Sequence, residues 1–516
     1  MDYLFKTEPY GHQLHAFNES RALENYALLW EMGTGKSKLI IDTAAWLHSQ
    51  GKIQCLLVIA PKGVHRNWIT KEVPVHIPDW ISTTCCYWVS SPRAAEKKIM
   101  AKVFTDDATN LRIISINYDA LIQKKGRQFI EKVLLMFKTL MVLDESQRIK
   151  TPDAKRTTAS IALGRKAAYK RILSGTPVPK SPLDLFSQYK FLDPTILKWT
   201  TFSAFRAHHA VVRDQWDPLV IHIMKQNNMR RAPILIAEDE NGRPMYRNIP
   251  ELKQRIAPIT SIARKEDCLD LPEKVYLQIP VELSDDQRRA YRSMIEDAVA
   301  DLRTDVADQS KIPADPVAAF EYLLGLDGSG VVKAANGMVK QLRLQQIIGG
   351  YPTDGEDEIV PFDKIPKMDK LIETIKFDID PDASIIIWSC FRAEIRGIVE
   401  RLNKEFPSAG VVEYHGSISD DDRAEAIDSF QNKKARFFVG QQHAGGLGIT
   451  LTAATYVFYY TNNRSGEDRQ QSEDRAHRIG QEEKVTIVDF IAEDTIDSKI
   501  LAEHELKREL SEEIMS

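Results

Sequence analysis

The feature that most limits the fold of this chain is an alternation of short apolar runs with longer stretches of helical pattern. Four such runs in the first half are Cys55–Ala60, Leu111–Ile116, Leu140–Leu143 and Arg171–Leu173. Runs of this length between helical patterns are typical of buried strands in a parallel sheet wrapped by helices. Each run ends where polar residues, glycine or proline begin, which is the edge where open α/β sheets bind ligands.

A second set of apolar runs, later in the chain, predicts a second sheet. Its members are Ser384–Trp388, Val411–Tyr414, Phe437–Val439, Tyr456–Tyr460 and Val485–Phe490. The predicted fold class is therefore α/β, with two lobes that each contain a parallel sheet flanked by helices. We place the N-terminal lobe at residues 1–272 and the C-terminal lobe at residues 273–516.

The stretches outside these two sets lack the strand rhythm. We expect one helical insertion in the N-terminal lobe at about residues 194–255 and another in the C-terminal lobe at about residues 285–350. The second insertion has a soft interior at Gln309–Pro316. The last helix, Thr495–Met515, carries an apolar stripe, so we expect it to pack back on the protein as a brace.

Composition narrows the class of protein. The 516 residues are 43% hydrophobic and 28% charged, which is typical of a globular protein in water. There is no run long enough for a membrane span and no signal-peptide core near the N-terminus, and the five cysteines lack metal-binding spacing. We expect a cytoplasmic protein with reduced thiols, associated with the nucleoid or, if the protein is viral, located in the host cytoplasm.

The net charge of −4 does not by itself indicate a nucleic-acid-binding protein. The segment Arg148–Arg171 is strongly basic, however, and Asp153 is its single acid. A protein that moves along DNA needs a basic face and not an overall positive charge. The segment fits either such a face or an ordinary solvated surface.

A phosphate-binding loop is predicted at Glu31–Ser37, which reads E-M-G-T-G-K-S. Gly33 and Gly35 let backbone N–H groups curl around phosphate oxygens at the start of a helix. Lys36 would reach the β- and γ-phosphates, and the Ser37 hydroxyl would bind Mg²⁺. Taken alone, the pattern could also be an ordinary flexible loop.

A pair of carboxylates, Asp144 and Glu145, follows the apolar run Leu140–Leu143. Adjacent carboxylates at the end of a buried strand are costly unless a cation is bound there. Asp144 would hold Mg²⁺, and Glu145 would orient and activate the attacking water. The alternative is a surface turn, which the phosphate-binding loop upstream makes less attractive.

Two arginines, Arg475 and Arg478, lie three residues apart in the segment Gln471–Gln481. This spacing predicts that both point from one face of a helix. Guanidinium groups pair bidentately with phosphate oxygens, so the pair suits a polyphosphate. The alternatives are a solvated charged helix, or a role for Arg475 in bracing Glu473 or Asp474.

These motifs together resemble the SWI/SNF-type ATPases of helicase superfamily two, the group that includes the chromatin-remodelling motors. The loop matches that family's pattern, including the absence of a first glycine at Trp30. Asp144–Lys150 (D-E-S-Q-R-I-K) resembles its D-E-A-H-R-I-K box, with departures that leave both carboxylates intact. Leu173–Pro177 (L-S-G-T-P) matches the third motif, and Asp474–Gln481 (D-R-A-H-R-I-G-Q) matches the sixth without a change.

Weaker matches extend the resemblance over nearly the whole chain. Pro9–Gln13 resembles the adenine-reading segment, and Ala60–Trp68 resembles a motif that touches the tracking strand of DNA. Ala263–Lys274 resembles the crossing between lobes, with one arginine of the usual pair missing. Gly445–Leu451 matches the fifth motif, with Thr450 where asparagine is common. The short insertions resemble compact prokaryotic or viral members.

The resemblance implies two RecA-like lobes, ATP and Mg²⁺ as cofactors, and four groups of site residues. The catalytic residues are Lys36, Glu145, Arg475 and Arg478. The nucleotide-binding residues are Gln13, Met32, Gly33, Thr34, Gly35, Lys36, Ser37, Asp144 and Gly448. The Mg²⁺ ligands are Ser37 and Asp144. The DNA-binding residues are Lys62, Asn117, Tyr118, Thr176, Ser389, Gly416, Gly445 and Gly446.

The leading functional hypothesis is a DNA-stimulated ATPase that moves along double-stranded DNA without separating its strands. ATP held between the lobes would close them, and hydrolysis would release them. Contacts to phosphate carry no sequence information, so binding to DNA should tolerate any sequence. The alternatives are a strand-separating DNA or RNA helicase and an ATP-gated scaffold. Trp68 and Trp388 could stack on bases or pack in the core.

Overall fold

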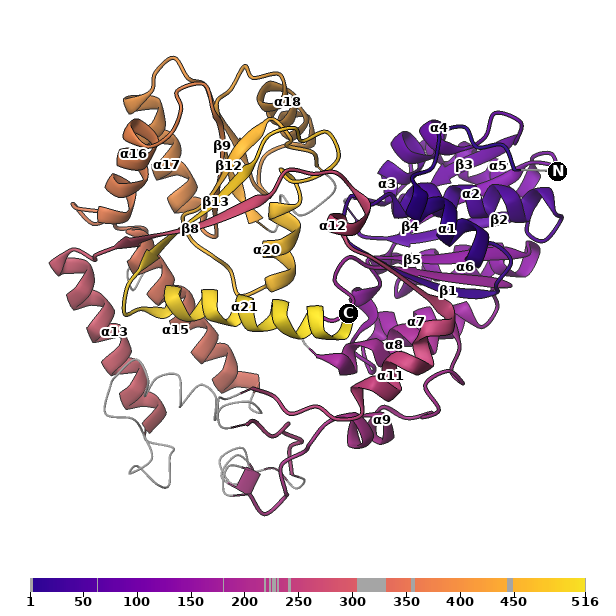
Figure 1. Cartoon of the computed structure of the whole chain (residues 1–516), viewed down its shortest axis with the longest axis horizontal. Coiled ribbons are helices and arrows are strands. Elements are labelled where there is room, and N and C mark those ends of the chain that lie inside the picture. The colour runs from indigo at the N-terminus through magenta and orange to yellow at the C-terminus, as the bar shows by residue number, and fades with distance from the viewer. Residues whose placement is uncertain are drawn as a thin grey trace. The chain divides into compact units, whose positions relative to one another are not determined.

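A computed structural model of the chain describes residues 3–62, 64–179, 181–217, 220–221, 224, 229, 232–239, 243–303, 331–353, 358–442 and 449–515. The backbone contacts divide the chain into two compact units. Unit 1 contains Met1–His209, Tyr246–Leu271 and Lys507–Ser516, and unit 2 contains Ala210–Met245 and Pro272–Leu506. Figure 1 shows one sheet with its flanking helices in each unit.

Unit 1 contains a seven-stranded sheet in the order β3-β4-β2-β5-β6-β1-β7, and every neighbouring pair is parallel. The strands are β1 (Asn25–Trp30), β2 (Cys55–Ala60), β3 (Thr83–Tyr87), β4 (Leu111–Asn117), β5 (Thr139–Asp144), β6 (Tyr169–Leu173) and β7 (Thr260–Ala263). All residues of β2 and β5 are buried, as expected for a parallel sheet that is covered on both faces.

The helices of unit 1 follow the strands along the chain. They are α1 (Gly11–Ser20), α2 (Lys36–Ser49), α3 (His65–Asn67), α4 (Val73–His76), α5 (Ala94–Thr105), α6 (Lys124–Met136), α7 (Lys155–Gly164), α8 (Leu185–Leu192), α9 (Phe202–His209), α11 (Ile249–Ile256) and α12 (Lys265–Cys268). The 3₁₀ and π turns are η1 (Trp68–Glu72), η2 (Tyr118–Leu121), η3 (Ser146–Ile149), η4 (Pro182–Asp184) and η5 (Ala257–Ile259).

Strand register brings the predicted site residues of unit 1 to one edge of the sheet. Ala60 at the end of β2 pairs with Asn117 at the end of β4. Asp144 at the end of β5 pairs with Leu173 at the end of β6. Since all these strands are parallel, their carboxyl ends share the edge where ligands of such sheets bind.

Unit 2 contains a six-stranded parallel sheet in the order β10-β11-β9-β12-β13-β8. Its strands are β8 (Lys274–Val281), β9 (Ser384–Ser389), β10 (Val411–Tyr414), β11 (Phe437–Gln441), β12 (Ala454–Tyr459) and β13 (Val485–Ala492). The helices after β8 are α13 (Asp285–Arg303), α15 (Val331–Gly349), α16 (Pro366–Phe377), α17 (Arg392–Glu405), α18 (Asp420–Gln431), α20 (Gly466–Glu473) and α21 (Ile496–Met515). The predicted fold class, two parallel sheets flanked by helices, is confirmed.

The insertions are more varied than the sequence indicated. The segment 194–255 contains α9 and α11, but its middle also forms two isolated antiparallel bridges, Val212↔Ile236 and Glu238↔Pro244. The segment therefore combines helices with short extended pieces that pair with each other. In the second insertion α13 and α15 are helical, and the predicted interior Gln309–Pro316 lies outside the described residues.

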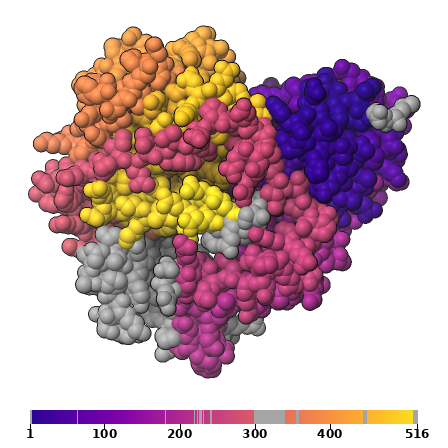
Figure 2. Space-filling view, in the orientation of Figure 1, coloured from indigo at the N-terminus to yellow at the C-terminus, as the bar shows by residue number. Residues whose placement is uncertain are grey.

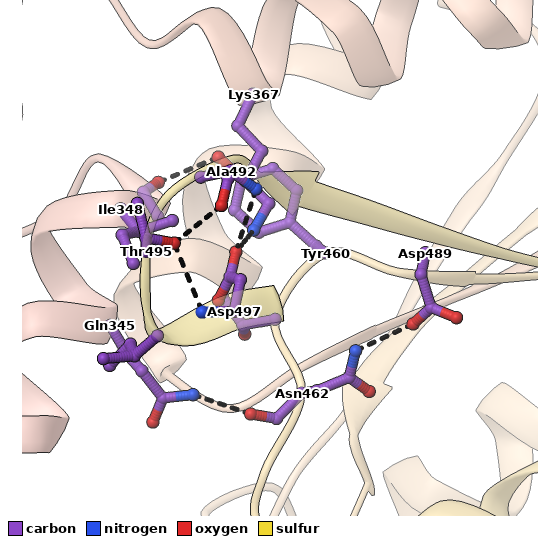
Figure 3. A network of polar contacts seen from close by, with 12 residues as sticks. Gln345, Ile348, Lys367, Tyr460, Asn462, Asp489, Ala492, Thr495 and Asp497 are labelled. Carbon is purple, nitrogen blue, oxygen red and sulfur yellow. Dashed lines mark hydrogen bonds and ion pairs between the residues drawn. The ribbon is translucent and has the colours of Figure 1, made fainter. Parts of the chain in front are cut away.

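The start of α21 is fixed in unit 2 by a buried ion pair. Lys367 on α16 and Asp497 on α21 are joined by a 2.6 Å contact, with side chains 1% and 5% exposed (Figure 3). Thr495 Oγ1 donates to the Ala492 carbonyl, which ties the helix start to β13. Further along, His504 Nε2 donates to the Asn463 carbonyl. Helix α21, in yellow, is visible at the surface in Figure 2.

Candidate nucleotide site

The predicted phosphate loop connects β1 to α2. Gly33 and Gly35 have φ angles of 81° and 86°, which lie in the left-handed region that favours glycine. Gly35 is also the N-cap of α2, and a Cβ at this position would lie 2.0 Å from Gln13 Nε2. A larger residue at 35 would therefore be strained and would also collide with α1. The loop geometry and the N–H groups of the helix start suit a bound phosphate.

The side chains of the loop are held close to its own backbone. Lys36 Nζ donates to the carbonyls of Trp30 and Glu31 at 2.8 and 3.0 Å. Thr34 Oγ1 donates to the Glu31 carbonyl at 2.8 Å. The Lys36 ammonium therefore lies over the loop. Lys36 and Ser37 are the first two residues of α2.

The predicted adenine-reading segment contacts this loop directly. Gln13 Nε2 donates to the Thr34 carbonyl at 3.1 Å, and Gln13 Oε1 accepts the Tyr10 N–H. The His12 ring also donates to the Thr34 carbonyl, at 2.8 Å. This role of His12 could not be predicted from the sequence. Its partner lies 22 residues away, so the contact leaves no local pattern. The Pro9–Gln13 segment and the phosphate loop are therefore joined by hydrogen bonds.

Asp144 lies at the end of β5 and is 9% exposed. Burial, together with the neighbouring Glu145 charge, raises the pKa of its carboxyl to about 7, while the bond from Trp68 and the Lys36 charge act to lower it. Trp68 Nε1 donates to Asp144 Oδ2 at 2.9 Å. Trp68 is 1% exposed and Trp388 is 0% exposed, so both pack in the core, which rules out the base-stacking alternative.

Glu145 is joined to the third motif by a chain of hydrogen bonds. Its φ angle is 53°, and Gln147 Nε2 donates to its Oε2 at 2.9 Å. Gln147 Oε1 in turn accepts from Ser174 Oγ at 2.8 Å, and the Thr176 N–H donates to Ser174 Oγ. In the sequence, Gln147 stands out only as a departure from the D-E-A-H-R-I-K motif. The structure makes it the link between Glu145 and the segment that contains Thr176.

We predict that Gln147→Met lowers the turnover number for ATP by about tenfold, because a hydrogen bond to a charged group contributes about 1.5 kcal/mol. The variant retains the side-chain volume and loses the bonds that fix Glu145. The KM for ATP should change little, since the hydrogen bonds of Gln147 described above go to Glu145 and Ser174. Steady-state kinetics would measure both. Gln128→Met, on the exposed face of α6, is the control, and an equal loss there would contradict the prediction.

The other predicted DNA contacts of unit 1 differ in accessibility. The side chain of Lys62 is exposed. Asn117 Oδ1 accepts from the Ala120 N–H, and the Tyr118 hydroxyl donates to the Asp144 carbonyl at 2.8 Å, with Tyr118 only 2% exposed. Thr176 is 7% exposed, and its Oγ1 has no hydrogen-bond partner among the described residues. Of these four side chains, Lys62 is exposed, Asn117 is half-buried, and Tyr118 and Thr176 are buried.

The arginine pair of unit 2 is arranged differently from the prediction. Helix α20 ends at Glu473, so Arg475 and Arg478 lie in the turns that follow it and not on one helical face. The two guanidinium groups nevertheless converge, because Nη1 of each is directed at the Ile449 carbonyl, at 3.4 and 3.5 Å. Arg478 Nη1 also donates to Thr450 Oγ1 at 3.0 Å.

The turn geometry has a local cause. The Leu451 N–H donates to the Arg475 carbonyl, which removes that carbonyl from a continuing helix. Gly480 has a φ angle of 96°, and Gln481 Nε2 donates to the carbonyls of Thr452, Ala454 and Ala476. These bonds tie the D-R-A-H-R-I-G-Q segment to Leu451, the last residue of the fifth motif, and to the residues that follow it.

The remaining predicted site residues of unit 2 have mixed surroundings. Ser389 is fully buried, and its hydroxyl donates to Glu394. The Gly416 carbonyl accepts from Arg423 Nη2 at 2.8 Å, and a Cβ at Gly416 would meet no atom within 4 Å. The predicted residues Gly445, Gly446 and Gly448 lie outside the described residues.

Glu394, which the sequence did not single out, is a fully buried acid on α17 that also accepts from Thr461 Oγ1 at 2.7 Å. Burial raises the pKa of its carboxyl from 4.5 to about 7, although the bonds from Ser389 and Thr461 lower it. A raised pKa in the folded state means that the folded protein binds this proton more tightly than the unfolded chain. Its contribution to stability is therefore present below pH 4.5 and is lost as the pH rises to about 7.

We predict that Glu394→Gln becomes more stable relative to the unchanged protein as the pH rises from 5 to 8. The difference in the free energy of unfolding should shift by about 2 to 3 kcal/mol in favour of glutamine, because one unit of pKa corresponds to about 1.4 kcal/mol. Urea unfolding of both proteins at the two pH values would measure this shift. A difference in the free energy of unfolding that does not vary with pH would contradict a raised pKa for Glu394.

The residues available for a cation fit Mg²⁺. Ser37 and Asp144 offer a hydroxyl and a carboxylate, the oxygen ligands that this ion prefers alongside phosphates and water. Within the described ranges there is no group of three or more His, Cys, Asp or Glu side chains that could hold a metal by themselves. Mg²⁺ at this site would therefore depend on the phosphates of a bound nucleotide.

None of the helices in the described part of the chain combines the length and the apolar character needed to cross a membrane.

Comparisons with known proteins identify the family. A family model described as SNF2-related domain matches residues 17–324, and one described as helicase conserved C-terminal domain matches residues 366–480. The first match covers more than half of the chain. The chain therefore belongs to the SNF2-related family of helicase-like ATPases, and its two sheets are the RecA-like lobes of that class.

Three relatives illustrate this similarity. The putative ATP-dependent helicase/translocase YwqA of Bacillus subtilis is 24% identical over 94% of this chain and 46% of its own length. The DNA annealing helicase and endonuclease ZRANB3 of Bos taurus is 25% identical over 91% of this chain and 37% of its own length. The ATP-dependent helicase brm of Drosophila melanogaster is 24% identical over 95% of this chain and 28% of its own length. The chain spans less than half the length of each of these relatives.

A solved structure, the Sulfolobus solfataricus SWI2/SNF2 ATPase core in complex with dsDNA, aligns with 100% of this chain and 96% of that chain, at 21% identity and a TM-score of 0.40.

Proposed function

We propose that this protein hydrolyses ATP and uses the energy to move along double-stranded DNA. The observation that carries the proposal is the arrangement at the carboxyl edge of the unit 1 sheet. A glycine loop and a helix start suited to phosphate lie in the same unit as a strand that ends in Asp144 and Glu145. This is the set of groups that cleavage of a nucleoside triphosphate requires.

In the proposed reaction, the loop N–H groups and Lys36 bind the β- and γ-phosphates. Glu145, oriented by Gln147, accepts a proton from the attacking water. Bound Mg²⁺, held by Ser37 and Asp144, would neutralise charge on the phosphates. Arg475 and Arg478 stabilise the charge that develops on the γ-phosphate, with Arg478 as the principal residue. The convergence of both guanidinium groups on Ile449 supports a joint role.

Movement would follow from the sharing of one nucleotide by two lobes. A ligand that contacts both lobes favours the closed state, and loss of the γ-phosphate removes that preference. The path of the DNA would include Lys62 and the Gly416 turn, together with Asn117, Tyr118, Thr176, Ser389, Gly445 and Gly446. Since phosphate contacts dominate, binding should tolerate any sequence and should weaken with salt.

The second candidate is a strand-separating helicase, a term that appears in the names of several relatives. The two candidates differ in what happens to a blunt duplex that carries a third strand. A translocase displaces the third strand in the presence of ATP and leaves the duplex intact, whereas a helicase separates the duplex itself. The Glu145→Gln variant serves as the control in both assays. Efficient separation of the blunt duplex would contradict translocation, and ATP binding without hydrolysis would favour an ATP-gated scaffold.

A further inference from the structure

The first residues of unit 2 after Leu271 contact the segment that contains the two arginines. The His477 ring donates from Nε2 to the Pro272 carbonyl at 2.7 Å. His477 lies between Arg475 and Arg478 in the sequence, so this bond fixes the centre of the segment. Pro272 begins the longer of the two stretches that make up unit 2, directly after Leu271 of unit 1.

Two residues later, Lys274 contacts the acids that immediately precede Arg475. Lys274 Nζ lies 3.1 Å from Glu473 Oε2 and 3.7 Å from Asp474 Oδ1. The Lys274 side chain is 20% exposed, while those of Glu473 and Asp474 are 8% and 4% exposed. The Tyr276 hydroxyl donates to the same Glu473 oxygen at 2.9 Å. An ion pair so well shielded from water is screened little by salt.

Glu473 is held on its other side as well. Its Oε1 accepts from Arg469 Nε at 2.8 Å, and Arg469 also pairs with Asp489 on β13. Burial raises the pKa of Glu473, but the charges of Lys274 and Arg469 outweigh burial and lower it to about 2. Glu473 is therefore a fixed anion at neutral pH. Each of its oxygens meets a different cation, so the last residue of α20 cannot rotate without breaking one of these pairs.

The contacts of Pro272 and Lys274 therefore hold the segment that carries the two arginines. Glu473 and Asp474 precede Arg475, and His477 separates it from Arg478. Without the Lys274 charge, Glu473 would keep its pair with Arg469, but Glu473 and Asp474 would be adjacent buried anions that repel each other and would push the turn out of position. A displacement of about 1 Å in a group that acts on a transition state can reduce the rate about a hundredfold.

We propose that Lys274 is a positioning residue for ATP hydrolysis, which holds the turn that carries Arg475 and Arg478 through its ion pairs with Glu473 and Asp474. The inference rests on the proposed role of these arginines. It adds that one of the connections between the two units, the one at Leu271 and Pro272, leads directly to contacts with the segment that carries them. A change in that connection would then alter the arginines without contact to ATP.

The test compares Lys274→Met with Lys274→Arg in the full chain, with ATP turnover measured at saturating DNA. Lys274→Met should lower kcat between about tenfold and a hundredfold, with less than about a twofold change in the KM for ATP, because ATP binding to the unit 1 loop does not involve Lys274. Lys274→Arg retains the charge and should recover most of kcat. Recovery by arginine separates positioning from general packing.

Lys367→Met is the matched control, since Lys367 also forms a buried ion pair in unit 2, with Asp497. It should lower the melting temperature and leave the kcat of the folded protein unchanged. Lys274→Met with an unchanged kcat would overturn the inference, as would an equal loss of kcat in Lys367→Met. If the unchanged protein shows no hydrolysis that depends on Glu145, the proposed function itself fails, and the two failures are thereby distinguished.

Discussion

The Glu145→Gln variant should bind ATP with the affinity of the unchanged protein and hydrolyse it at least about a hundredfold more slowly. A positioned general base contributes about 10²- to 10⁴-fold to a rate, and glutamine cannot accept the proton of the attacking water. The substitution preserves the side-chain shape and an oxygen that can accept from Gln147 Nε2. The hydrogen-bond chain to Ser174 can therefore persist, and the loss is expected in the chemical step.

Single-turnover hydrolysis and equilibrium binding of ATP would measure the two quantities separately. Lys36→Ala provides the contrast, because it removes a phosphate contact and should lose binding as well as turnover. Glu131→Gln, on a half-exposed position of α6, is the matched control. Normal DNA-stimulated hydrolysis by Glu145→Gln would show that the catalytic base has been assigned to the wrong residue.

Arg478→Ala should reduce hydrolysis by about 10³- to 10⁵-fold, the range for an arginine that stabilises phosphoryl transfer. The alanine removes the guanidinium that donates to Thr450 Oγ1 and approaches the Ile449 carbonyl. ATP binding should fall much less, since the phosphate loop, Lys36 and Gln13 all belong to unit 1. Arg475→Ala should give a smaller loss if Arg478 is the principal residue.

The measurement is kcat together with ATP affinity for both variants. Arg401→Ala is the control, because Arg401 is a partly exposed arginine on α17 that pairs with Asp369 and Glu405. Unchanged turnover in Arg478→Ala would refute its catalytic role. Loss of ATP binding equal to the loss of turnover would instead indicate that the residue acts on the ground state.

The covered strands β2, β5 and β9 and the edge strand β10 could be predicted from sequence, and the edge strands β3, β7 and β8 could not. β2, β5 and β9 are buried along their whole length and have the runs expected of a covered parallel sheet. β8, in contrast, pairs only with β13, and Tyr276 and Leu277 on it are 48% and 49% exposed. An edge strand needs no apolar run on both faces, so its sequence need not mark it.

The candidate site shows the same division between local and distant causes. The glycines of the phosphate loop and the acids after β5 follow from adjacent residues, and both were recognised. The turns at Arg475 and Arg478 depend on bonds to Leu451 and to the carbonyls near Thr452, which lie more than twenty residues away. Spacing alone favoured a helix, because it contains no information on these partners.

The bond between Trp68 and Asp144 gives the proposed Mg²⁺ site an optical reporter. An indole that donates to a carboxylate in a shielded setting emits according to the charge on that carboxylate, and Trp68 Nε1 lies 2.9 Å from Asp144 Oδ2. Addition of Mg²⁺ and a nucleotide should therefore change the intrinsic fluorescence of the protein without any dye. The difference between the spectra of the unchanged protein and of Trp68→Phe would isolate this signal, so that loading of the nucleotide could be followed in real time.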